Sequence, residues 1–295
     1  MFLFTFVLLF PLVLTQQKKT VTVGVAAVEN VMQPFIGYSL SGGAIGIALD
    51  RMRLEGIATG FDFKTMKKLA YCEHSYGTSN IHVMDSFRFL VNFTECTADN
   101  AVGLAVDFMK KHSVDAVIAP PCPIPAEIMG HLSTFYKKTL LGWGFLTDSK
   151  FSNSDLFPYI TKVVPDTLGM VNCVLQLFST FNWDRVAVFY TSNEVQYCES
   201  IADDATIALN DNSLYYVDVV QKTMVPSNND AYLTKQLLRA KQTVRIILMC
   251  MDTAKDTRKF MRIASELQMV SDEFVYVSFG ALGLGFGKIL LFRAG

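Results

Sequence analysis

Residues 101–122, AVGLAVDFMKKHSVDAVIAPPC, contain the pattern that decides the fold. Apolar residues recur at helical spacing up to His112, a short run rich in valine follows, and prolines end that run. A helix that leads into a short, largely apolar strand is typical of the units that build a parallel sheet. This stretch therefore predicts a helix over 98–112 and a strand over 114–119 in an α/β protein.

The same alternation continues toward both ends of the chain. It predicts strands at 21–27, 87–93, 139–143, 185–190, 215–220, 244–249 and 274–278. It predicts further helices at 41–55, 126–136, 168–181, 194–210, 231–241 and 253–267. Right-handed crossovers place such helices on both faces of a parallel sheet. We therefore expect two doubly wound lobes, over 16–147 and 148–295, with residues 148–158 as a linker.

Two stretches depart from this rhythm. Residues 64–86 stand where a connection of about 2–6 residues is usual, which indicates an insertion in the first lobe. The glycine-rich tail after Ser278 is too short for another strand and helix, or for the ~20 residues of a membrane span. The tail does not form a phosphate-binding loop, because Leu282 and Ile289 replace the glycine and the hydroxyl residue that such a loop requires.

The N-terminus and the cysteines indicate export. Residues 1–15 are almost wholly apolar and polar residues follow at once, so we predict a signal peptide cleaved after Thr15. An uncleaved anchor or a buried strand is the alternative for this segment. The 6 cysteines, none in a C-x-x-C pair, suit an oxidising compartment, and so does the glycosylation sequon at Asn92.

The composition and the motifs argue against several function classes. A net charge of −1 with 18% charged residues leaves no basic surface for nucleic acid. The 4 histidines form no zinc-binding pattern, and no nucleophile elbow precedes a helix. The turn after the first strand contains no glycine, unlike that of a dinucleotide-binding enzyme. We therefore predict a binding protein that is not an enzyme and has no metal or cofactor.

Candidate ligand contacts follow the predicted strands, because parallel α/β sheets bind ligands beyond the carboxyl ends of their strands. The candidates are three aromatic walls and three polar anchors: Trp143, Phe145, Phe279, Glu29, Thr191 and Asp252. The alternative for the aromatic residues is that they only pack the hinge between the lobes.

Five strings of the sequence carry a family resemblance. They are FLVNFTEC (89–96), AVGLAVDFMKKHSVDAVIAPPC (101–122), FNWDRVAVFYTSNEVQYC (181–198), RIILMC (245–250) and FVYVSF (274–279). In this order they resemble the extracellular ligand-binding region of receptor-type guanylate cyclases and natriuretic-peptide receptors, over about residues 20–290. The resemblance implies the type I periplasmic-binding-protein fold, with two lobes, a hinge and a cleft. The C-terminal elements that return to the first lobe in that family are missing here.

The resemblance also implies two disulfides, which would close loops of 26 and 52 residues: Cys96–Cys122 and Cys198–Cys250. We then expect Cys72 to be a thiol in the insertion and Cys173 to be buried on a helical face, with a bond between the two as the alternative. Natriuretic-peptide receptors bind chloride with help from a glycine before the turn cysteine. Pro121 stands there in this chain and has no N–H to donate, so we expect no chloride site.

The function implied by the resemblance is that of a sensor. The sequence would be the ligand-binding region of a receptor guanylate cyclase, outside the cell, with an unidentified small molecule or peptide bound between the lobes. The transmembrane helix, kinase-like domain and cyclase domain of the family are absent from it, and a homodimer through the first lobe is an open question. The alternative is a soluble secreted protein of the same fold that scavenges or presents a ligand.

Overall fold

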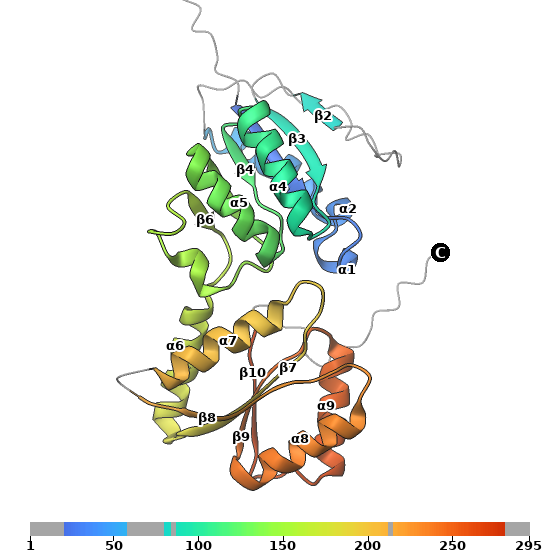
Figure 1. Cartoon of the computed structure of the whole chain (residues 1–295), viewed down its shortest axis with the longest axis vertical. Coiled ribbons are helices and arrows are strands. Elements are labelled where there is room, and N and C mark those ends of the chain that lie inside the picture. Colours follow the sequence, from blue (N-terminus) through green and yellow to red (C-terminus); the bar gives the residue numbers. More distant parts are fainter. Residues whose placement is uncertain (1–20, 58–79, 84–86, 212–214, 281–295) are drawn as a thin grey trace, which may run out of the picture.

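The computed structural model describes residues 21–57, 80–83, 87–211 and 215–280, which form two lobes (Figure 1). The predicted signal peptide, Cys72 with most of the predicted insertion, and the tail after Gly280 lie outside the described residues. None of the described helices is long and apolar enough to cross a membrane.

The first lobe is built on a six-stranded sheet. Its strands are β1 (Val21–Ala27), β2 (Asn80–Val83), β3 (Phe87–Phe93), β4 (Ala116–Ile118), β5 (Thr139–Gly142) and β6 (Ile160–Lys162). Their order is β2-β3-β1-β4-β5-β6, and every neighbouring pair is parallel except β2 with β3. The central β1 has Val25 between Val91 of β3 and Ile118 of β4.

Helices cover both faces of this sheet. The helices of the first lobe are α1 (Gln33–Ile36), α2 (Tyr38–Ser41), α3 (Gly43–Leu54), α4 (Ala98–Val106) and α5 (Pro123–Tyr136). A π-helical turn, Asp107–Lys111, extends α4. The apolar face of α3, with Leu49, packs on one side of β1 and β3, while α4 and α5 pack on the other. This is the two-sided cover that the helical spacing predicted.

The second lobe repeats the plan with four parallel strands. They are β7 (Arg185–Tyr190), β8 (Asp218–Met224), β9 (Ile246–Cys250) and β10 (Val275–Ser278), in the order β10-β9-β7-β8. Its helices are α6 (Thr167–Phe181), α7 (Tyr197–Asn210), α8 (Asp230–Thr243) and α9 (Ala254–Glu266). One apolar cluster lies beneath α6 and α7, and another beneath α8 and α9. The α/β fold with doubly wound sheets is confirmed.

Two strands extend the first sheet beyond the prediction. β6 pairs with β5, so the sheet continues past the boundary predicted after residue 147 and resumes just after the segment interpreted as linker. β2 lies at the end of the predicted insertion and pairs antiparallel with β3, an arrangement that needs no crossover helix. We therefore place the end of the first lobe after Lys162.

The two lobes share one apolar core. Val28, Cys122 and Phe145 of the first lobe pack in the same buried cluster as the residues beneath α6 and α7. Gly144 makes this approach possible: its φ is +74°, and a Cβ there would lie 2.5 Å from the Pro121 Cβ. The backbone can therefore turn tightly against Pro121 and direct Phe145 toward the second lobe.

Candidate functional site

The carboxyl ends of the parallel strands of both sheets converge between the lobes (Figure 1). Val28 follows β1 and Phe145 follows β5, and both belong to the same buried cluster as Phe279, which follows β10 of the other sheet. Beyond the carboxyl ends of parallel strands is where this class of sheet binds ligands. The region between the lobes is therefore the candidate site.

The predicted phenylalanines lie inside the shared core. Phe145 is 2% exposed and its ring centroid is 4.9 Å from that of Tyr197 on α7. Phe279 is 6% exposed and belongs to the same cluster. In this conformation both side chains therefore connect the lobes, which corresponds to the hinge-packing alternative.

Trp143 and Glu29 have partners within the first lobe. The Trp143 Nε1–H donates to the Ala119 carbonyl at 2.7 Å and fixes the half-buried indole against β4. The Glu29 carboxylate accepts from the Ser39 N–H at 2.9 Å, and the backbone N–H of Glu29 donates to the Glu95 carboxylate at 3.1 Å. These bonds hold the loop after β1 in place, so both residues shape the edge of the region.

Thr191 and Asp252 are brought together at the ends of β7 and β9. The Thr191 hydroxyl donates to Oδ2 of Asp252 at 2.8 Å and accepts from the Asp252 N–H at 2.8 Å. Asp252 is only 7% exposed, and its Oδ1 is buried without a hydrogen-bond donor. A buried acceptor without a partner is costly and needs an explanation. This pair is the clearest polar anchor in the second lobe.

Burial raises the pKa of the Asp252 carboxyl to about 6. The Thr191 hydrogen bond opposes the shift, while the nearby carboxylates of Asp256 and Glu194 add to it. Because the folded pKa lies above the ordinary value of 3.8, the folded protein binds this proton before the unfolded chain does. Asp252 therefore makes the fold more stable as the pH falls through about 6, and this gain is complete below the ordinary pKa.

We expect Asp252→Asn to remove this pH dependence. Between pH 7 and pH 4.5 the free energy of unfolding of the parent should gain about 2 kcal/mol from Asp252. Urea unfolding of parent and variant at both pH values measures the difference. Asp155→Asn, an exposed carboxyl on a turn, is the control and should keep the parental dependence. Equal pH dependence in the parent and in Asp252→Asn would contradict the assignment.

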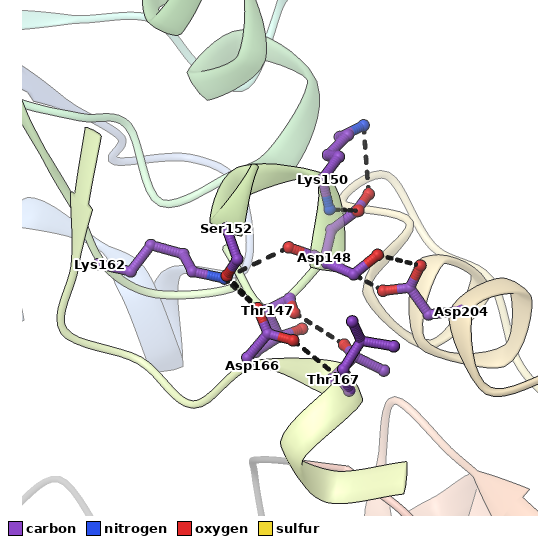
Figure 2. A network of polar contacts seen from close by, with 10 residues as sticks. Thr147, Asp148, Lys150, Ser152, Lys162, Asp166, Thr167 and Asp204 are labelled. Carbon is purple, nitrogen blue, oxygen red and sulfur yellow. Dashed lines mark hydrogen bonds and ion pairs between the residues drawn. The ribbon is translucent and has the colours of Figure 1, made fainter. Parts of the chain in front are cut away.

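A polar network that the sequence analysis missed surrounds the connection between the lobes (Figure 2). Asp166 caps α6 by accepting from the Leu168 N–H at 2.8 Å, and it pairs with Lys162 at 2.8 Å. Thr167 donates both its N–H and its hydroxyl to the Thr147 carbonyl, each at 2.8 Å. The start of α6 was predicted within one residue, and an aspartate just before an apolar helical run is a capping signal that could have indicated the role of Asp166.

Both implied disulfides are present. Cys96 and Cys122 join the loop after β3 to the start of α5, and Cys198 and Cys250 join α7 to β9. Cys173 is an exposed free thiol, so the prediction that it is buried was wrong. The buried face of α6 is formed by Val171, Val174, Leu175 and Phe178, and position 173 falls outside that helical stripe.

Comparisons with known proteins identify the family. The model of the "Receptor family ligand binding region" matches residues 78–285. The chain belongs to this family. It is 36% identical over 273 residues to the receptor-type guanylate cyclase gcy-19 of Caenorhabditis briggsae, covering 92% of this chain and 20% of that protein. It is 34% identical to gcy-4 of C. briggsae and 30% identical to gcy-1 of Caenorhabditis elegans, covering 92% of this chain and 22% of each.

The family match confirms the predicted resemblance, fold and class of function. The chain spans about a fifth of the length of these cyclases, and the matched part is the ligand-binding region, an extracellular domain, and not the cyclase catalytic domain. Within the described residues, no group of three or more His, Cys, Asp or Glu side chains is arranged to hold a metal ion.

Proposed function

We propose that this chain is the sensor region of a receptor guanylate cyclase and that it takes its ligand between the two lobes. The observation that carries the proposal is the match to receptor-type guanylate cyclases over 92% of the chain at up to 36% identity. Guanylate cyclase activity itself is proposed only for the longer protein. In that protein, a ligand that favours one arrangement of the lobes would shift their populations and transmit the change.

The six predicted contacts are proposed as the ligand site. Thr191 and Asp252 supply polar anchors from the second lobe, and Glu29 and Trp143 shape the edge of the first. Phe145 and Phe279 lie in the shared core and Thr191 and Asp252 are equally buried, so these four would meet a ligand only after the lobes move apart. The donor-free Oδ1 of Asp252 favours a ligand that donates a hydrogen bond.

The export and assembly of the domain are part of the same proposal. We propose that residues 1–15 direct secretion and that a glycan is attached to Asn92, whose side chain is exposed on β3. A homodimer through the first lobe is proposed from the family resemblance. A soluble secreted binding protein of the same fold is the second candidate, and sequencing the transcript downstream of the Gly295 codon distinguishes it from a receptor that continues into cyclase domains.

A thermal-unfolding screen tests the ligand site. The probes are free amino acids, biogenic amines, organic acids and short peptides, added to the full chain with its disulfides formed. A ligand at one hundred times its Kd stabilises the folded state by about 2.7 kcal/mol. We expect Thr191→Ala to weaken that stabilisation and Thr234→Ala, on the surface of α8, to preserve it. A ligand that stabilises the parent and both variants equally would place its site elsewhere.

A further inference from the structure

The 3₁₀ helix Ser149–Ser152 lies between β5 and β6 and is anchored in the first lobe. Phe151 is buried in the core of that lobe, 5.6 Å from the Phe157 ring. Lys150 pairs with Glu127 on α5 at 2.7 Å and with Asp148 at 3.2 Å. This short helix therefore moves with the first lobe.

One carboxylate of the second lobe accepts two hydrogen bonds from this 3₁₀ helix. Asp204 on α7 accepts from the Ser149 N–H at 2.7 Å and from the Ser149 hydroxyl at 2.8 Å. Figure 2 shows Asp204 facing the segment of Asp148 and Lys150 from the helix beside it. α7 packs on the sheet of the second lobe, so both bonds cross between the lobes. Separating the lobes along this contact breaks the two bonds together.

The surroundings of Asp204 disfavour its ionised form. Burial raises the pKa of this carboxyl, and the neighbouring Asp148 and Asp166 raise it further, whereas the two bonds from Ser149 oppose the shift. The nearby lysines are engaged elsewhere, Lys150 with Glu127 and Asp148 and Lys162 with Asp166. In the described part of the chain no lysine or arginine lies within ion-pair distance of Asp204. The two hydrogen bonds from Ser149 are therefore the interactions that stabilise its negative charge.

We propose that the Ser149–Asp204 contact is a latch that holds the two lobes in the orientation seen here, and that the ionised Asp204 weakens it. The inference rests on the proposed function only in assuming that the lobes can move relative to each other. It assigns to Asp204 a positioning role, since the residue lies at the hinge and away from the Thr191–Asp252 anchor.

Two substitutions at this position should have opposite effects. Asp204→Ala removes both acceptors, and the loss of the two hydrogen bonds should increase the population with displaced lobes about tenfold. Asp204→Asn can still accept from the Ser149 N–H and can donate to its hydroxyl, but it carries no charge beside Asp148 and Asp166. We expect this variant to hold the lobes at least as firmly as the parent.

The distance between the lobes in the full chain, without ligand, is the readout. Spin labels are attached to the exposed Cys173 on α6 and to Lys110→Cys, an exposed position on the π-helical turn that extends α4, in a background carrying Cys72→Ser. Pulsed electron–electron double resonance then gives the distribution of distances between the two labels. Asp203→Ala is the matched control, because the neighbouring Asp203 pairs with Lys222 inside the second lobe.

The latch predicts a displaced population in Asp204→Ala and none in Asp204→Asn or Asp203→Ala. An unchanged distribution in Asp204→Ala would overturn it, and so would equal displacement in the alanine and asparagine variants. If Asp204→Ala does not melt cooperatively, Ser149→Ala, which removes only the hydroxyl bond, must show a smaller displacement, and a parental distribution there overturns the latch. Because no ligand is added, this result is independent of whether a ligand binds between the lobes.

A pH arm tests the role of the charge. Asp204 binds a proton more readily with the lobes together than when it is solvated, so acid should favour the latched arrangement in the parent. Asp204→Asn should lack this dependence, and its persistence in the variant would assign the effect to another group and overturn the role of the charge.

Discussion

Replacing Phe145 by alanine is expected to lower the free energy of unfolding by about 3–5 kcal/mol. The side chain is 2% exposed and fills the core that the lobes share, against Tyr197. Its removal would leave a cavity that neither lobe can collapse into without changing their relative positions. Urea unfolding of the full chain, followed by tryptophan fluorescence, measures the loss.

Phe135→Ala provides the comparison for this experiment. Phe135 is 77% exposed on α5, so its truncation should change stability by no more than about 0.5 kcal/mol. If Phe145→Ala costs as little as Phe135→Ala, the shared core does not hold the lobes together in solution. Phe145 would then be an open wall of the cleft, as one of the two sequence interpretations had it.

A shared core and a polar latch have different consequences for lobe motion. The core around Phe145 favours contact between the lobes without specifying an angle, because apolar burial is not directional. The bonds between Ser149 and Asp204 are directional and fix the geometry. A ligand that separates the lobes would have to offset both.

The sequence predicted the buried strands well and missed the two edge strands of the first sheet, β2 and β6. The runs at 21–27, 87–93 and 185–190 match β1, β3 and β7 to the residue, because each is a run rich in apolar and β-branched residues. β6 contains only Ile160, Thr161 and Lys162 and shows no such run. A strand of this length is recognised by its pairing with β5, which sequence periodicity does not reveal.

The site was predicted in part for a similar reason. The rule that ligands bind past the strand ends selected Thr191 and Asp252 separately, and the structure brings them together although they are 61 residues apart. It could not show that Phe145 is buried by residues of the other lobe. It also missed Asp204, which lies within α7, away from any strand end, and whose partner Ser149 is 55 residues away.

Removing the Cys198–Cys250 disulfide by a double alanine substitution is expected to cost about 4 kcal/mol. The bond spans 52 residues, and in the chain-entropy model its loss frees a loop of that length in the unfolded state. Removing Cys96–Cys122, which spans 26 residues, should cost about 0.6 kcal/mol less. Urea unfolding of both double variants, without reductant, measures the two values, with Cys173→Ser as the control for loss of a thiol.

The position of this bond gives it a further effect on the site. Cys250 ends β9, two residues before Asp252, and its carbonyl accepts from the Thr191 N–H at 3.1 Å. Cys198 ties that strand end to the first turn of α7, the helix that also carries Asp204. The disulfide therefore connects the Thr191–Asp252 pair to α7, the helix that carries Asp204.

The entropic basis of the stability prediction has a clear test. If the double variant loses no more stability than Cys173→Ser, the unfolded chain gains little freedom when the disulfide is removed, and that basis is wrong.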